Sequence, residues 1–193
     1  LENAGGNPKY SEIKGRGHDS WNDAFGSREL WQWVYSQERR VPGVRFDPVK
    51  MDLEGWTVYV DPSLLEEQHA ALGKEAIKML ANHLQRIKIF VPEKQLKTLQ
   101  TLEIWLERHH PTLGAMQYHP GSGWLRDNGH DPRLHKKVHL PRAAALLSRQ
   151  QILKHPAVIL HELAHSYHDQ ILGFDHQDVK RAYDRAMAAG KYQ

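Results

Sequence analysis

Two histidines and a glutamate near the end of the chain have the spacing of a zinc-hydrolase site. His161 and His165 lie four residues apart, and Glu162 directly follows the first of them. In a helix, residues four apart share one face, so both imidazoles can bind one zinc ion at about 2.0–2.1 Å. Glu162 then lies about 100° around the helix axis, where its carboxylate can take a proton from a zinc-activated water and pass it to a leaving amine.

The alternative is a surface helix that carries histidines by chance. The chain has 14 histidines among 193 residues, and composition alone produces such a motif in about six of a hundred chains of this kind. The surrounding sequence favours a helix of about 17 residues, because Pro156 suits a first turn and Gly173 suits a stop. Between these two residues, apolar side chains recur at helical spacing: Leu160, Leu163, Ala164, Tyr167, Ile171 and Leu172. We therefore expect the motif to lie on one face of an amphipathic helix.

A zinc hydrolase also needs a third protein ligand and an open position for water. The extended metzincin pattern is excluded, because His168 and Ile171 stand where that pattern has Gly and His. His168 shares the face of His161 but lies about 10.5 Å along the helix from it, too far for one ion to bind both. Further candidates follow without a spacing that selects any of them: Asp169, Asp175, His176, Asp178 and Asp184.

The motif belongs to a longer run from Leu160 to Gln170, which continues into Leu172-Gly173-Phe174. Two earlier segments accompany it: Ala115-Met116-Gln117-Tyr118-His119-Pro120, and Gly123-Trp124-Leu125 with Asn128-Gly129. Over residues 114–193 the chain resembles bacterial HExxH metallopeptidases of the gluzincin kind and, more distantly, the anthrax lethal-factor type. The resemblance implies a zincin-like active-site helix, with His161 and His165 as zinc ligands and Glu162 as general base. It also implies that the third ligand is a Glu on a later helix, after residue 193.

A second set of motifs lies at the start of the chain: Gly5-Gly6-Asn7-Pro8-Lys9-Tyr10-Ser11-Glu12, Gly17-His18-Asp19-Ser20-Trp21 and Leu30-Trp31-Gln32-Trp33. This stretch resembles the C-terminal tail of an α/β-hydrolase of the esterase or prolyl-oligopeptidase kind. The resemblance implies that His18 matches the histidine of a catalytic triad. The sequence contains no Gly-x-Ser-x-Gly segment, so His18 has no nucleophile here to activate, and we favour a loop histidine beside Trp21.

The two resemblances predict two parts of the chain. Residues 1–40 are expected to be the α/β-hydrolase remnant, and residues 41–193 a metallopeptidase-like domain that is incomplete at its C-terminal end. Pro and Gly within Arg39-Arg40-Val41-Pro42-Gly43 predict a linker between them. The second part is expected to be α+β, a small mixed sheet packed with helices. Its predicted strands are 56–60, 99–106, 116–119 and 137–140, and its predicted helices are 64–89 and 93–96, while a helix over 27–37 belongs to the first part.

The composition of the chain limits the kinds of partner that we expect it to bind. The net charge of +3 comes with Lys and Arg that are scattered along the chain, so we expect no nucleic-acid partner. No run approaches about eighteen apolar residues, so no transmembrane helix is expected. Without cysteine there are no disulfides and no thiolate ligands, and secreted, periplasmic and cytosolic locations all stay open.

Other histidines and aromatic residues allow two interpretations each. His119 could lie on an edge strand that holds an extended peptide beside the zinc, but we favour a strand-end histidine on a turn. Tyr167 could stabilise an oxyanion, but its place on the apolar stripe favours the core. Three more histidines are spaced too irregularly to predict a second site: His130, His135 and His139. Trp105 and Trp124 are the tryptophans expected to contact the sheet.

These observations predict zinc-dependent hydrolysis of a peptide or protein substrate, with zinc as the cofactor. Two rival functions stay open. In one, His18 belongs to a serine esterase or peptidase of α/β-hydrolase type whose triad is completed before Leu1, and the C-terminal half is a non-catalytic binding module. In the other, the motif holds zinc, or nothing, without catalysis. Cleavage specificity and oligomeric state are left open by the sequence.

Overall fold

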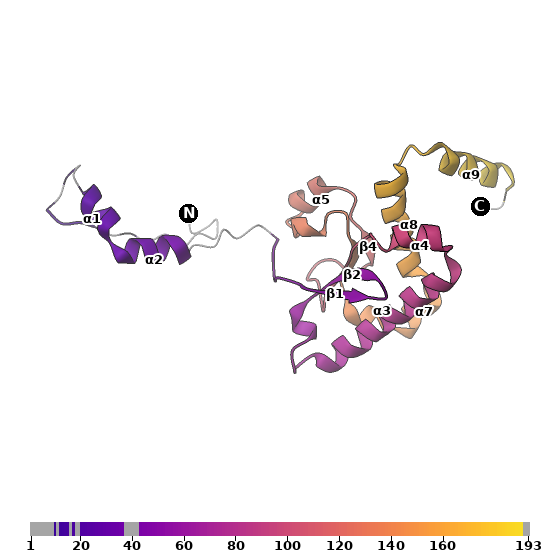
Figure 1. Ribbon diagram of the computed structural model, residues 1–193, viewed down its shortest axis with the longest axis horizontal. Coiled ribbons are helices and arrows are strands. Elements are labelled where there is room, and N and C mark those ends of the chain that lie inside the picture. The colour runs from indigo at the N-terminus through magenta and orange to yellow at the C-terminus, as the bar shows by residue number, and fades with distance from the viewer. Residues whose placement is uncertain (1–9, 11, 16, 18–19, 37–42, 191–193) are drawn as a thin grey trace. The chain divides into compact units, whose positions relative to one another are not determined.

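The computed structural model describes residues 10, 12–15, 17, 20–36 and 43–190 (Figure 1). Contacts within the chain divide it into two compact units, Leu1–Arg40 and Val41–Gln193. The assignment of the first unit to an α/β-hydrolase stays a prediction, and both His18 and residues 39–42 of the predicted linker lie outside the described residues.

The described part of the first unit contains two short helices, α1 (Trp21–Gly26) and α2 (Arg28–Ser36). The second matches the helix predicted over 27–37. The indole Nε1 of Trp31 donates a hydrogen bond to the carbonyl of Phe25 at 2.6 Å, which links the two helices.

The second unit is an α+β fold built on a small five-stranded sheet, so the coarse fold class is confirmed. Its strands are β1 (Val49–Leu53), β2 (Trp56–Val60), β3 (Ile104–Leu106), β4 (Gln117–Tyr118) and β5 (Val138–Leu140), and their order in the sheet is β1-β2-β3-β5-β4. The sheet is mixed as predicted, because β2, β3 and β5 run parallel while β1 and β4 are antiparallel to their neighbours. The strand nearest the predicted site, β4, is therefore an edge strand.

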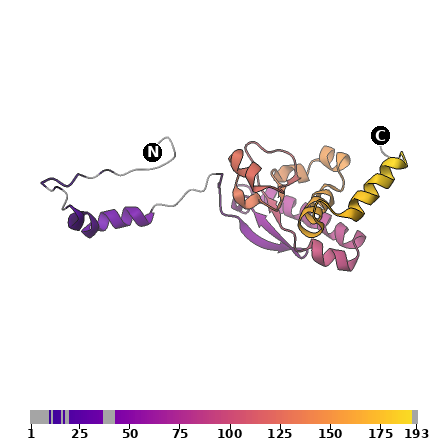
Figure 2. The same cartoon turned by 90° about the horizontal axis from the view of Figure 1, so that it is seen from above.

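The helices of this unit alternate with the strands along part of the chain. They are α3 (Ala70–Phe90), α4 (Glu93–Leu99), α5 (Ser122–Asp127), α6 (Ala143–Leu146), α7 (Arg149–Lys154), α8 (Val158–Tyr167) and α9 (Gln177–Ala188), with 3-10 turns η2 (Pro62–Leu64) and η3 (Pro132–Leu134) and a π-helical turn η4 (His168–Leu172). Figures 1 and 2 show α9 extending away from the end of α8. No helix among the described residues is long and apolar enough to span a membrane.

The main core lies on the face of the sheet that α3 and α8 cover. Because successive side chains of a strand point to opposite faces, Val58, Ile104 and Val138 face this side together. They pack with Leu80 of α3 and Leu163 of α8, all five fully buried. Burial of these apolar side chains holds α8, and with it the histidine motif, against the sheet.

Several predicted boundaries were wrong. The strand predicted over 99–106 exists only from Ile104 onward, because Leu99 ends α4 and reaches the same core from a helix. The long helix begins at Ala70 and not at 64, since the Asp61 carboxylate accepts a hydrogen bond from the Ser63 N–H and caps a separate turn, η2. The predicted motif helix is confirmed as α8, but its last five residues wind as the π-helical turn η4 before Gly173 ends it with a φ of 81°.

We expect Gly73→Ala to destabilise the second unit by about 1–3 kcal/mol, although alanine is the better helix former. A Cβ at position 73 would lie 1.9 Å from the carbonyl oxygen of Leu64, so α3 could no longer approach η2. Gly121→Ala is the matched control, since no atom lies within 4 Å of its added Cβ. The free energy of unfolding from denaturant titration tests this, and equal stability of both variants would contradict it.

Candidate functional site

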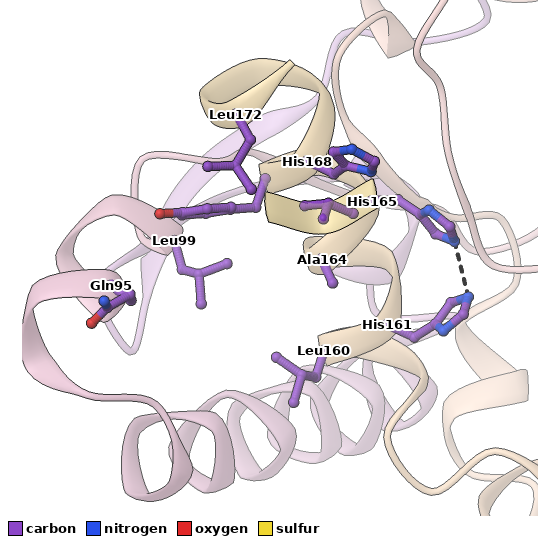
Figure 3. A pocket seen from close by; sticks show the side chains of 10 residues that line it. Gln95, Leu99, Leu160, His161, Ala164, His165, His168 and Leu172 are labelled. Atoms are coloured by element: carbon purple, nitrogen blue, oxygen red, sulfur yellow. Dashed lines mark hydrogen bonds between the residues drawn. The ribbon is translucent and has the colours of Figure 1, made fainter. Parts of the chain in front are cut away.

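The packing of α8 sorts its side chains into a buried and an exposed set. Ile159, Leu163 and Ser166 are fully buried against the sheet, while His161 and His165 are exposed on the other side. The Nε2 atoms of the two histidines lie 3.0 Å apart, and their rings meet edge to face (Figure 3). The structure thus brings the two predicted ligands together, with their ring nitrogens converging.

This convergence fits a zinc ion. Two Zn–N bonds of about 2.0–2.1 Å at a tetrahedral angle separate their nitrogens by about 3.3 Å, close to the separation in this pair. Neutral imidazoles bind such an ion through the nitrogen that carries no proton. Within the described residues, no group of three histidine, aspartate or glutamate side chains is placed to hold a metal ion, so the two predicted ligands, His161 and His165, have no third partner there.

Three of the five downstream candidates for a third ligand form ion pairs with lysine or arginine. Asp169 pairs with Lys136, and the Asp178 and Asp184 carboxylates pair with Arg181 and Lys180 of α9. The ring of His168 packs edge to face on Phe174, with 5.3 Å between centroids. His168 therefore lies beside the histidine pair without joining it, as its distance along the helix predicts.

Glu162 is held by the edge strand. Its carboxylate is only 9% exposed, and Oε2 accepts a hydrogen bond of 2.9 Å from the backbone N–H of Tyr118 in β4. Burial raises the pKa of Glu162 above its usual value, although His161, the Tyr118 N–H and His165 each oppose the rise. A carboxylate with a raised pKa beside two potential ligands suits a group that both takes and returns a proton.

A second contact fixes the same strand to the end of the motif helix. The Tyr118 hydroxyl donates a hydrogen bond of 2.6 Å to Oδ2 of Asp169, which also forms an ion pair with Lys136. Burial raises the pKa of Tyr118 above its usual value, and the Asp169 carboxylate raises it further. Asp169 is the second residue of η4, so the π-helical turn places this carboxylate over the end of β4.

Two hollows border His161. The first, the Leu160 cavity, measures about 490 Å³ and is almost wholly apolar, with Leu99, Leu160, Ala164, Tyr167 and Leu172 in its wall (Figure 3). Tyr167 is half-buried and packs on the core, so its contacts fit the interpretation of Tyr167 as a core residue.

The second hollow, the Met116 groove, measures about 520 Å³ and lies on the other side of His161. Gly114, Ala115 and Met116, which lead into β4, form one wall, and another is formed by Gln151 of α7 with residues 154–158, which run from the end of α7 into α8. His161 and Glu162 lie in it together. An extended chain in this groove would pass beside the edge strand and the candidate catalytic carboxylate.

A buried polar cluster on the opposite face of the sheet was not predicted. Glu107, His110, His119, His130 and His139 are each 8% exposed or less. His119 Nε2 lies 3.1 Å from His139 Nδ1, and His139 Nε2 lies 3.2 Å from Oε1 of Glu107. The signal that could have found this cluster is the alternation of β5, which places His139 on the face away from Val138 and Leu140.

The Glu107 carboxylate is the anion of this cluster. Burial alone would raise its pKa, but contact with His139 and with the Arg45 guanidinium outweighs burial and holds the pKa below its usual value. Nδ1 of His110 accepts hydrogen bonds from the N–H groups of Thr112 and Leu113, so Nε2 carries the proton and cannot bind a metal. Among the described residues, no three side chains of this cluster are placed to hold a metal ion.

His119, Trp105 and Trp124 lie in or near this cluster and have structural roles. His119 follows β4 and is the strand-end histidine that we favoured, although it is buried in the cluster and not exposed on a turn. Trp105 lies in β3 and contacts the sheet as predicted, with its ring stacked on Tyr59. Trp124, which is 48% exposed, stacks on His119 and contacts the His130 ring at a tilt of 39°.

Comparison of the chain with protein-family models, with curated proteins and with solved structures gave no match.

We expect the second unit to lose stability as the pH falls from about 6.5 towards 3. Burial lowers the pKa of His110 to about 4 and that of His119 to about 3, both below the ordinary 6.5. The unfolded chain therefore binds protons in this range before the folded chain does, so the free energy of unfolding is highest above pH 6.5 and decreases below it. Thermal unfolding measured across this range tests the slope.

His119→Gln separates titration from packing, because a glutamine amide can still donate to His139 Nδ1 but cannot take up a proton. We expect a shallower pH dependence for this variant. His109→Gln, at an exposed neighbour of the cluster, is the control and should keep the wild-type slope. A wild-type slope in His119→Gln would contradict the account.

Proposed function

We propose that the chain carries the zinc-binding helix of a metallopeptidase and takes part in hydrolysis of peptide bonds. His161 and His165 would hold the zinc ion, with a third ligand after residue 193, and Glu162 would act as general base and then general acid. The observation that carries the proposal is one arrangement on α8. Two exposed imidazoles converge at 3.0 Å while the adjacent carboxylate is buried and oriented by an edge strand.

Zinc at such a site polarises a scissile carbonyl and lowers the pKa of water towards about 7. The residues of this chain supply the proton transfers and the hydrogen bond that orients the Glu162 carboxylate. Glu162 accepts the proton of the attacking water and later transfers it to the leaving amine. The Tyr118 N–H binds one carboxylate oxygen, Oε2, and so leaves the other to exchange the proton.

The Met116 groove is where a peptide substrate would bind. Extended peptides bind to sheet edges through main-chain hydrogen bonds, and β4 is the edge next to α8. Because Glu162 occupies the Tyr118 N–H, the peptide would lie along the preceding residues 114–116, which form a wall of the groove. That path takes it past both His161 and Glu162.

Glu162→Gln should reduce zinc-dependent cleavage of a fluorogenic peptide by at least about a hundredfold, because an amide cannot take the proton. The measurement uses a polypeptide that continues past Gln193. Zinc content should be unchanged in the variant, since both histidine ligands remain. Chelation should abolish cleavage by the wild type, and added zinc should restore it.

Glu66→Gln is the matched control for this experiment. It removes one carboxylate from an exposed position outside the motif, and wild-type cleavage is expected. Retained zinc-dependent cleavage in Glu162→Gln would contradict the assignment of Glu162 as the base.

A further inference from the structure

The Met116 groove carries positive charge as well as the candidate catalytic pair. Lys154, at the end of α7, lies in its wall together with His155. The Arg142 guanidinium lies next to this wall, because its Cζ would lie 3.4 Å from a Cβ added to Gly114, another residue of the wall. Lys154 is thus a cation of the wall itself, and Arg142 is a second cation beside Gly114.

These cations are not neutralised by carboxylates of this unit. Nine other Lys and Arg side chains among the described residues of the unit form ion pairs, and neither Arg142 nor Lys154 is one of them. No Asp or Glu occurs in the sequence between Asp131 and Glu162. The only carboxylate in the groove is that of Glu162, which the Tyr118 N–H already binds.

The Leu160 cavity on the other side of His161 differs in this respect. No Lys or Arg lies in its wall, and its surface is almost wholly apolar. The charge is therefore a property of one side of the histidine pair, the side on which Glu162 also lies. A ligand selected by charge would bind on that side.

We propose that the Met116 groove selects peptides with a carboxylate near the residues that lie at His161 and Glu162, through Arg142 and Lys154. The substrate class is then acidic peptides, an inference that rests on the proposed peptidase function for its link to cleavage but not for binding. Arginine binds a carboxylate through two parallel N–H groups, and Lys154 adds a second positive charge. Both side chains are exposed, so the preference is moderate and weakens as salt increases.

Binding of capped, rhodamine-labelled octapeptides to the full 193-residue chain, followed by fluorescence anisotropy at low salt, tests this. One peptide has two central glutamates, and its partner has two glutamines at the same positions. We expect the glutamate peptide to bind about five- to tenfold more tightly. In Arg142→Gln/Lys154→Gln the ratio should fall to about one, whereas Lys78→Gln, an exposed cation on α3, should keep it.

A third peptide, the glutamine peptide with a free C-terminal carboxylate, distinguishes the source of the charge. Tighter binding of this peptide alone assigns the groove to a chain terminus, while tighter binding of the glutamate peptide assigns it to acidic side chains. Either result supports recognition of a carboxylate. Equal binding of all three, no binding, or a charge preference that survives the double substitution would overturn the proposal.

This binding test is independent of the proposed catalysis. If this chain binds the acidic peptide preferentially but its longer form cleaves no peptide, charge selection by the groove is supported and the peptidase function is contradicted. If the longer form cleaves peptides but binding shows no charge preference, the peptidase function is supported and charge selection is contradicted.

Discussion

The hydrogen bond from the Tyr118 N–H to the Glu162 carboxylate joins the two elements on which the site depends. A buried carboxylate needs a hydrogen-bond donor, and an edge strand leaves N–H groups without an acceptor, so each partner satisfies the other. The bond also sets the rotation of α8 against the sheet. With Glu162 turned inward to β4, His161 and His165 must face outward, where their ring nitrogens converge.

The sheet separates two kinds of polar chemistry. On the face covered by α3 and α8 the core is largely apolar, and polar groups of Tyr118, Glu162 and Asp169 join strand to helix. On the other face, Glu107 and four histidines form a closed cluster. The exposed histidine pair is open to a ligand, whereas the buried histidines bind to one another and to Glu107. A histidine-rich composition thus serves two separate purposes in one small unit.

Local patterns predicted the parts of the fold that local forces determine. The spacing of Leu160, Leu163 and Tyr167 identified the motif helix, and the β-branched run at 56–60 identified β2 with its bounds. By contrast, β1 was missed although its sequence, Val49-Lys50-Met51-Asp52-Leu53, alternates strictly between apolar and polar residues; on this edge strand only Met51 and Leu53 pack on the core. Helical spacing continued through η4 in the prediction, since nothing local marks a π-helical turn.

The candidate site shows the same limit. The spacing of His161, Glu162 and His165 placed them on one helix, but their orientation depends on Tyr118, which is 44 residues earlier in the chain. The buried cluster depends on contacts between residues 107, 119 and 139 that only the register of β3, β5 and β4 brings together. The alternation of β5 gives the face on which His139 lies but not the partners of His139, because these follow from strand order.

The central claim is that, of the histidines in this chain, His161 and His165 are those that bind zinc. Long-range proton–nitrogen NMR of the imidazole rings during a zinc titration tests it most directly, because each ring nitrogen reports its own ligand. The account predicts that the Nε2 signals of His161 and His165 shift together, while those of His110, His119, His130 and His139 keep their positions. Zinc-dependent shifts in the buried cluster, with none in His161 and His165, would contradict it.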